Sequence, residues 1–172
     1  MKTIDLRRHT AADGDVLTAD GVRAALDIGA RLDGDYDLFI SSGAQRATQT
    51  LACLLAGSGM RVNGGVVVDT RFRSDVEDRW KAAYQVAGAG DIASFERADP
   101  DLVKNESSAL GDALAGVFAA LPDGGRALIV GHSPMQEAAV YGSTGEIVDP
   151  LAKGAGIRVV LENDAYRVAS LP

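Results

Sequence analysis

The sequence of 172 residues has few aromatic side chains, at 5%, and contains only one cysteine and two histidines. With Cys53 alone, neither an intramolecular disulfide nor a thiolate metal cluster can form, and we interpret Cys53 as a small buried hydrophobic residue. An excess of basic residues is also missing: the net charge is −7, which argues against nonspecific nucleic-acid binding. Neither a signal peptide nor a membrane span is recognisable, so we expect a cytoplasmic protein.

The remaining composition is ordinary for a globular protein, with 47% hydrophobic and 24% charged residues. No repeat, low-complexity tract or linker divides the chain, so we expect one domain over residues 1–172. A negative net charge still permits a small anionic substrate, because a local group of arginines can outweigh it.

Apolar runs and helical periodicity alternate along the chain. Together they predict a mostly parallel α/β sheet with helices packed on it. Residues 11–17 are expected to form a loop, residues 71–106 two or three short helices over the sheet, and the cleanest helical stripe begins at Ser107. The expected strands are residues 4–9, 38–40, 65–68 and 127–130, followed by a hairpin of residues 156–161 and 166–169.

Both histidines follow predicted strands: His9 ends the first, and His132 comes two residues after Val130. Ligands of open α/β sheets bind at the carboxyl ends of strands. Arg8 precedes His9, and Arg46 lies in the first turn of a predicted helix, where backbone N–H groups favour an anion. Each residue alone is more often structural than functional, but their joint placement predicts a phosphate pocket.

Five segments, in the same order along the chain, resemble motifs of the histidine phosphatase superfamily. Residues 6–10 (Leu-Arg-Arg-His-Thr) resemble its Arg-His-Gly motif, and residues 41–50 (Ser-Ser-Gly-Ala-Gln-Arg-Ala-Thr-Gln-Thr) resemble its second motif. Residues 130–134 (Val-Gly-His-Ser-Pro) resemble its third, the Gly-His strand end. Residues 17–21 and 105–107 resemble its Leu-Thr-x-x-Gly helix start and Gly-Glu-Ser segment. The resemblance implies a three-layer α/β/α sandwich, phosphoglycerate mutase-like, with a mostly parallel central sheet.

The resemblance also implies a mechanism: a metal-independent phosphatase with no cofactor that forms a phosphohistidine on His9. The other ring nitrogen of His9 is expected to donate to a backbone carbonyl or a carboxylate, which keeps the attacking nitrogen unprotonated. Arg8 and Arg46 are expected to neutralise the phosphoryl oxygens, and His132 to hydrogen-bond them. Thr10, where the family usually has glycine, and Ser133 are further candidate phosphate-binding residues.

The general acid for the leaving group is open between Glu77, Asp75 and Asp78, with Glu77 preferred. The family usually takes this carboxylate from the segment after the third strand. At least two of the three are expected to be solvated helix-surface charges. Asp13 and Asp15 are expected to border the pocket.

Parts of the sequence also suggest other functions. An α/β-hydrolase nucleophile elbow is excluded because Met135 replaces its final glycine and no histidine follows residue 132. A phosphoglycerate mutase remains an alternative, although the chain looks short for one, as does an inactive phosphate-binding regulatory module. The expected partner is a small phosphorylated metabolite or a phosphoprotein; the sequence specifies neither the substrate nor the oligomeric state.

Overall fold

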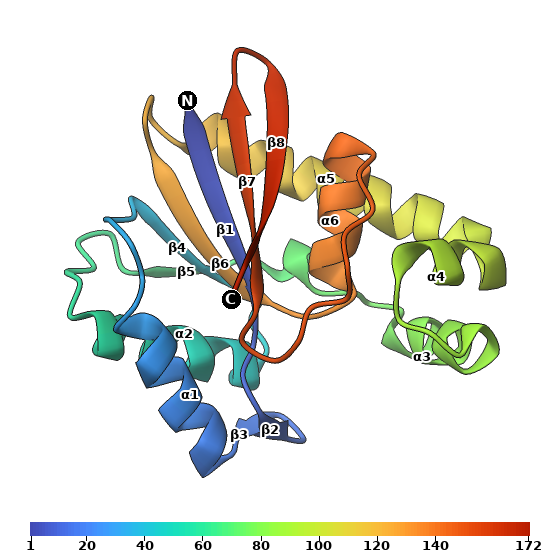
Figure 1. Cartoon of the computed structure of the whole chain (residues 1–172), viewed down its shortest axis with the longest axis horizontal. Coiled ribbons are helices and arrows are strands. Elements are labelled where there is room, and N and C mark those ends of the chain that lie inside the picture. Colours follow the sequence, from blue (N-terminus) through green and yellow to red (C-terminus); the bar gives the residue numbers. More distant parts are fainter.

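A six-stranded sheet in the order β5-β4-β6-β1-β7-β8 forms the centre of the computed structural model, which describes residues 1–172 (Figure 1). Its strands are β1 (Lys2–Arg8), β4 (Leu38–Ser41), β5 (Val66–Val68), β6 (Arg126–Gly131), β7 (Gly156–Glu162) and β8 (Ala165–Leu171). All pairings among β1, β4, β5 and β6 are parallel, whereas β7 and β8 are antiparallel. The prediction of a mostly parallel sheet that ends in a hairpin is confirmed.

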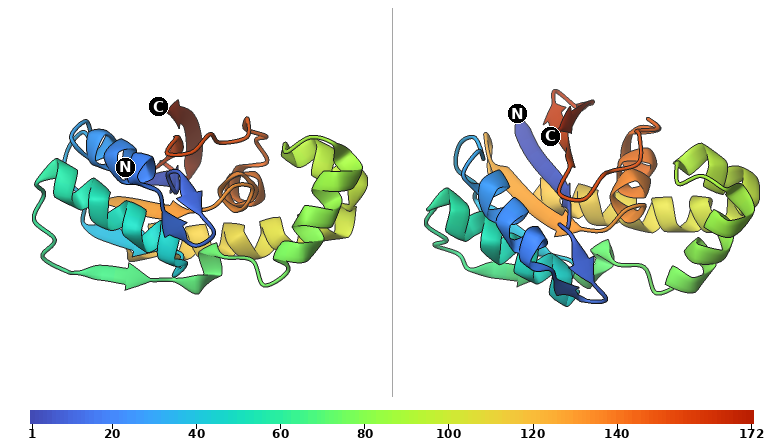
Figure 2. Two further views of the ribbon diagram at one scale, coloured as in Figure 1. Left: turned by 90° about the horizontal axis from the view of Figure 1, so that it is seen from below. Right: turned by 60° about the horizontal axis from the view of Figure 1, so that its bottom comes forward.

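Helices cover both faces of this sheet, which makes the three-layer α/β/α sandwich expected from the sequence (Figures 1 and 2). On one face α2 (Gln45–Ser58) packs against β4 and β6, with α1 (Ala19–Gly29) beside it. On the other face α5 (Pro100–Ala120) and α6 (Met135–Thr144) pack against each other and against β1.

The central strand β6 shows why the sequence folds in this way. Ala127 and Ile129 belong to the core beneath α5 and α6, whereas Leu128 and Val130 belong to the core beneath α2. A strand covered on both faces needs apolar side chains at every position, so its sequence is a continuous apolar run.

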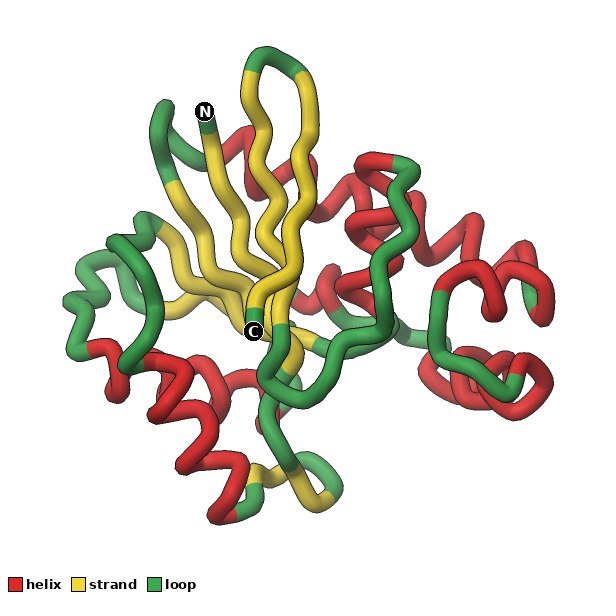
Figure 3. Tube along the Cα trace, in the orientation of Figure 1, coloured by secondary structure: helices red, strands yellow, loops and turns green.

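The segment of residues 71–106 departs from the expected arrangement. It does form short helices: η1 (Thr70–Phe72), α3 (Glu77–Ala87) and α4 (Ile92–Ala98). However, α3 packs on α4 and α4 packs on α5, to one side of the sheet rather than over it (Figure 3). The helix α5 also begins seven residues before Ser107, because Asp99 caps it by accepting from the Leu102 N–H and proline suits its first turn.

Residues 11–17 are also more regular than the expected loop. They form a small hairpin of β2 (Ala12–Asp13) and β3 (Val16–Leu17), which lies beside the start of α2. The amide of Gln49 on α2 fixes it, since its Oε1 accepts from the Leu17 N–H at 2.9 Å.

The helices α1 and α2 pack closely against each other through their C-terminal halves. A Cβ atom on Gly29 would lie 2.2 Å from the carbonyl oxygen of Leu54, and one on Gly57 would lie 2.2 Å from that of Leu26. Only glycine permits backbones to approach this closely. No helix of the chain combines the length and apolarity that crossing a bilayer requires.

Candidate active site

The ends of β1, β4 and β6 meet at one edge of the sheet and bring together residues distant in sequence. Arg8 pairs with Gly131 and Ser41 with Val130. His9 and His132 therefore face each other, with ring centroids 5.4 Å apart. Each is only 5% exposed. The sequence-based expectation that the two histidines share one location is confirmed.

The His9 ring is oriented by the backbone. Its Nδ1 lies 2.8 Å from the carbonyl oxygen of Thr10, an acceptor, so the ring proton resides on Nδ1. The Nε2 lone pair is then directed at cationic donors: Arg46 Nε at 3.2 Å and Lys153 Nζ at 3.4 Å. This is the orientation that a nucleophilic imidazole needs, with the anchoring carbonyl expected from the sequence.

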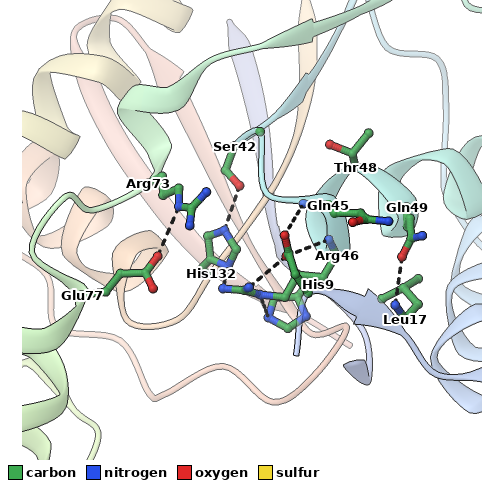
Figure 4. Close-up of polar contacts among 12 residues, drawn as sticks. His9, Leu17, Ser42, Gln45, Arg46, Thr48, Gln49, Arg73, Glu77 and His132 are labelled. Carbon is green, nitrogen blue, oxygen red and sulfur yellow. Dashed lines mark hydrogen bonds and ion pairs between the residues drawn. The ribbon is translucent and has the colours of Figure 1, made fainter. Parts of the chain in front are cut away.

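Arg46 links the two histidines (Figure 4). While its Nε donates to His9, its Nη2 lies 3.3 Å from His132 Nδ1. A guanidinium only donates, so Nδ1 of His132 accepts and its proton resides on Nε2, which donates to Ser42 Oγ at 2.8 Å. Ser42, at the end of β4, thus fixes His132 in the same way that the Thr10 carbonyl fixes His9.

Burial and positive neighbours keep both imidazoles neutral. Burial lowers the pKa of His9 to about 4, and the nearby charges of Lys153 and Arg46 act in the same direction. Burial likewise lowers the pKa of His132 to about 3, with a further contribution from Arg46. A neutral His9 has its lone pair available across the physiological pH range.

These residues line a cleft of about 330 Å³ between the sheet edge and α3. Of the three carboxylates considered as acids, only Glu77 lines it; Asp75 and Asp78 line a neighbouring hollow. Figure 4 shows Glu77 on the His132 side, where its Oε1 accepts from Arg73 Nε at 3.2 Å. Nowhere do three or more His, Cys, Asp or Glu side chains gather closely enough to hold a metal ion.

Comparisons with known proteins identify the fold. No protein-family model and no curated sequence matches the chain. A phosphoglycerate mutase from Bacillus anthracis str. Sterne has a TM-score of 0.74 at 20% identity, covering 98% of this chain and 92% of that one. A phosphoserine phosphatase from Entamoeba histolytica, solved with 3-phosphoglyceric acid, has a TM-score of 0.74 at 13% identity, covering 100% and 98%.

The protein histidine phosphatase SixA, solved with tungstate, has a TM-score of 0.62 at 15% identity, covering 98% of this chain and 96% of that one. All of these proteins are members of the histidine phosphatase superfamily. The chain has the histidine phosphatase fold. The expected phosphoglycerate mutase-like architecture is therefore confirmed.

Within this histidine phosphatase fold, Arg8 is fixed to the loop before β7. Its Nη1 donates to the Leu151 carbonyl, and its backbone N–H donates to the carbonyl of Ala155 at 3.0 Å. Glu137, buried in α6, completes the arrangement by accepting from the Leu151 N–H at 2.8 Å. Arg8 therefore lines the cleft with a side chain that is already held in place.

Two residues expected to bind phosphate have other partners. The Thr10 N–H donates to Thr50 Oγ1 at 3.1 Å, and the Thr10 hydroxyl lies 3.3 Å from the same oxygen. Thr10 is 1% exposed and does not line the cleft. Ser133 does line it, but its hydroxyl donates to the Glu137 carboxylate. Neither hydroxyl proton is available to a phosphate in this arrangement.

The start of α2 is likewise engaged, by Asp15 from the hairpin of residues 12–17. Its carboxylate accepts from the backbone N–H groups of Gln45 and Arg46, each at 3.2 Å, and from Arg46 Nη1 at 3.0 Å. The anion that the sequence predicts at the start of α2 is therefore the carboxylate of Asp15. Asp15, expected at the border of the pocket, pairs with Arg46 but does not line the cleft.

Sequence reasoning missed Lys153, which lines the cleft with its Nζ beside His9 Nε2. The residue precedes β7 in an irregular segment without apolar periodicity, so no pattern in the sequence pointed to it. Its position depends on contacts made by the loop of residues 145–155.

Proposed function

We propose that the chain is a phosphatase that hydrolyses a phosphomonoester or a phosphoramidate through a phosphohistidine on His9. One observation carries the proposal: the His9 Nε2 lone pair faces the cleft while Nδ1–H is held by the Thr10 carbonyl. An imidazole of this tautomer, surrounded by cationic donors and kept neutral by burial, is arranged for attack on an anionic phosphoryl group.

In the first step Nε2 forms a bond to phosphorus as the bond between phosphorus and the leaving atom breaks. The N–H groups of Arg46 that now contact the two histidines would move to the phosphoryl oxygens, beside those of Arg8. His132 Nδ1 accepts in the free protein, so it can donate to a phosphoryl oxygen only after gaining a proton. A bound dianion favours that proton.

Glu77 is the proposed proton donor to the leaving atom, since it is the carboxyl among the three considered that lines the cleft. It must first leave its contact with Arg73, because a carboxylate that accepts from a guanidinium carries no proton to give. A phosphoramidate needs less help of this kind, since its nitrogen leaves more easily. In the second step water attacks the phosphohistidine, which returns neutral His9 and releases phosphate.

Mutase-type phosphoryl transfer is the second candidate, and one observation favours it. The solved structure named phosphoglycerate mutase is matched over 92% of its length, so the shortness of this chain does not separate the two activities. A mutase would transfer the phosphoryl group of His9 to a second hydroxyl rather than to water. A catalytically inactive phosphate-binding module is the third reading, and it predicts anion binding without turnover.

The test is hydrolysis of p-nitrophenyl phosphate and of a panel of phosphorylated metabolites, in the presence of EDTA. We expect phosphate release by the wild type and a loss of roughly a thousandfold or more in His9→Ala. Turnover that survives His9→Ala, or that requires metal, would contradict the mechanism. Release of phosphate distinguishes hydrolysis from mutase transfer, and binding of tungstate without any turnover would favour the inactive module.

A further inference from the structure

Lys153 approaches the proposed nucleophile almost as closely as Arg46 does. Its Nζ lies 3.4 Å from His9 Nε2, compared with 3.2 Å for Arg46 Nε. We propose that Lys153 is a third catalytic cation of this site, which donates to a phosphoryl oxygen during transfer to His9. The inference rests on the proposed function and adds a residue to it.

Geometry determines which part of the substrate Lys153 can contact. In an in-line displacement the attacking and leaving atoms lie on opposite sides of phosphorus, and the attacking atom starts roughly 3–3.5 Å away. A donor beside Nε2 is on the attacking side of phosphorus. Lys153 therefore reaches the phosphoryl oxygens rather than the leaving atom, so its role is distinct from that of a general acid such as Glu77.

The loop that carries Lys153 is fixed on both sides of the residue. Leu151 is held through its N–H by Glu137 and through its carbonyl by Arg8. On the other side, the Gly154 carbonyl accepts from Arg7 Nη1 at 3.0 Å. Gly154 has a φ of +82°, and a Cβ there would lie 2.7 Å from Ile28 Cδ1, so the turn requires glycine.

No carboxylate pairs with Lys153. The charges that act on its ammonium are those of Arg8 and Arg46, both cations. The carboxylates that interact with these two arginines are Asp15, which pairs with Arg46, and Glu137, which acts on Arg8. Glu137 accepts from Ser133 and Leu151 through Oε1, whereas its buried Oε2 has no hydrogen-bond partner. Arg46 and Lys153 at the His9 lone pair, with Arg8 lining the same cleft, create a positive site that a phosphoryl dianion neutralises.

The protonation of Lys153 provides an independent readout. Burial, and then the charges of Arg8 and Arg46, lower the pKa of its ammonium to about 8. The cation is therefore present below pH 8 and is lost as the pH rises above it. Binding of a dianion through this ammonium should weaken above pH 8, by up to tenfold per pH unit.

The experiment compares Lys153→Met with Lys153→Arg, and with Lys104→Met as a control. Lys104 is an exposed lysine on α5, so its substitution changes the net charge equally without altering the cleft. Tungstate binding is measured by calorimetry between pH 7 and 9, and kcat/KM for p-nitrophenyl phosphate is measured on the same preparations. Circular dichroism verifies that each variant is folded.

We expect Lys153→Met to weaken tungstate binding by about tenfold or more and to lower kcat/KM by about 10- to 100-fold. Lys153→Arg should recover most of both and extend tight binding above pH 8, because arginine keeps its charge there. The decline in tungstate affinity above pH 8 should disappear in Lys153→Met, and Lys104→Met should match the wild type.

If tungstate binding and its pH dependence are unchanged in Lys153→Met, the role assigned to Lys153 is wrong. The proposed phosphatase function is not affected by that result. If the wild type binds tungstate through Lys153 but hydrolyses no phosphate ester, the proposed function is wrong. Lys153 is then an anion-binding residue only. Failure of the wild type to bind tungstate at all would overturn both.

Discussion

The cleft has two sides that are built differently. Its floor consists of Arg8, His9, Arg46 and His132, at the ends of the strands and the start of α2. Its wall consists of α3 and α4, residues 77–98. Every floor side chain is held by a hydrogen bond to the backbone or to another site residue. The polar contacts of the wall include exposed ion pairs, such as Arg79 with Asp99 and Lys81 with Asp78.

This difference between floor and wall suggests a division of roles, in which the floor would carry the proposed chemistry and the wall would select the substrate. Water screens exposed ion pairs, so they stabilise the wall little, and it is held mainly by its aromatic core, where the Trp80 and Phe95 rings meet edge to face at 5.1 Å. A floor fixed by buried contacts preserves the geometry that the proposed phosphoryl transfer requires. A wall that packs only beside the sheet can change its sequence without disturbing that geometry.

The largest effect should come from the floor residue that joins both histidines. Arg46→Gln removes donors that face the phosphoryl oxygens, so kcat/KM for p-nitrophenyl phosphate should fall about 100- to 1,000-fold. Arg61→Gln, which alters an exposed arginine beyond α2, is the charge-matched control and should stay within about twofold. If Arg46→Gln is as active as the control, Arg46 does not contribute to the proposed phosphoryl transfer.

Glu77→Gln tests the wall residue closest to the chemistry. We expect kcat to fall about 100-fold for an alkyl phosphate, whose leaving group needs a proton, and much less for p-nitrophenyl phosphate. Asp75→Asn is the control, because Asp75 lines the neighbouring hollow rather than the cleft. If Asp75→Asn shows the leaving-group dependence and Glu77→Gln does not, the proton donor is Asp75.

Tyr84 tests whether the rim of the wall selects the substrate. Its side chain lines the cleft and is 54% exposed, with its ring 6.4 Å from that of Phe95. Tyr84→Ala should raise KM about three- to tenfold for substrates that reach this rim and leave kcat unchanged. Tyr84→Phe keeps the ring and separates its contribution from that of the hydroxyl. A fall in kcat would assign Tyr84 to the chemistry instead.

The smallest change is expected when the wild type is moved to acid pH. A histidine of ordinary pKa would be mostly protonated at pH 5, whereas the pKa of His9 is about 4, so most of it stays neutral there. After correction for substrate ionisation, kcat/KM should change less than about twofold between pH 6.5 and 5. A titration near pH 6.5 in that profile would show that the floor does not hold His9 neutral.

The free energy of unfolding should also depend on pH through the lowered pKa values of His9 and His132. Because His9 and His132 bind protons more weakly in the folded state, the unfolded chain takes up more protons as the pH falls below about 6.5. The free energy of unfolding should therefore decrease from pH 6.5 toward pH 4. Urea melts of the wild type and of His132→Gln should show a shallower decrease in the variant.

The sequence predicted the floor better than the wall for physical reasons. Continuous apolar runs identified β1 and β6, and polar residues directly after such strands must lie at the edge of the sheet, which located His9 and His132. Lys153 was missed because its position depends on a loop held by Glu137 and Arg8, contacts between residues far apart in sequence. The direction in which α3 and α4 leave the sheet depends on packing against α5 and follows no periodicity.

Strand order has a consequence for protein synthesis. Residues His9 and Arg46 emerge from the ribosome early, but β1 and β4 are not neighbours, since β6 lies between them. Until residues 126–131 have been made, β1 has neither of its pairing partners, because β7 follows still later in the chain. A nascent or truncated chain that stops before β6 thus has His9 but no sheet edge on which to present it. The proposed active site is therefore completed only late in synthesis, once β6 has joined the sheet.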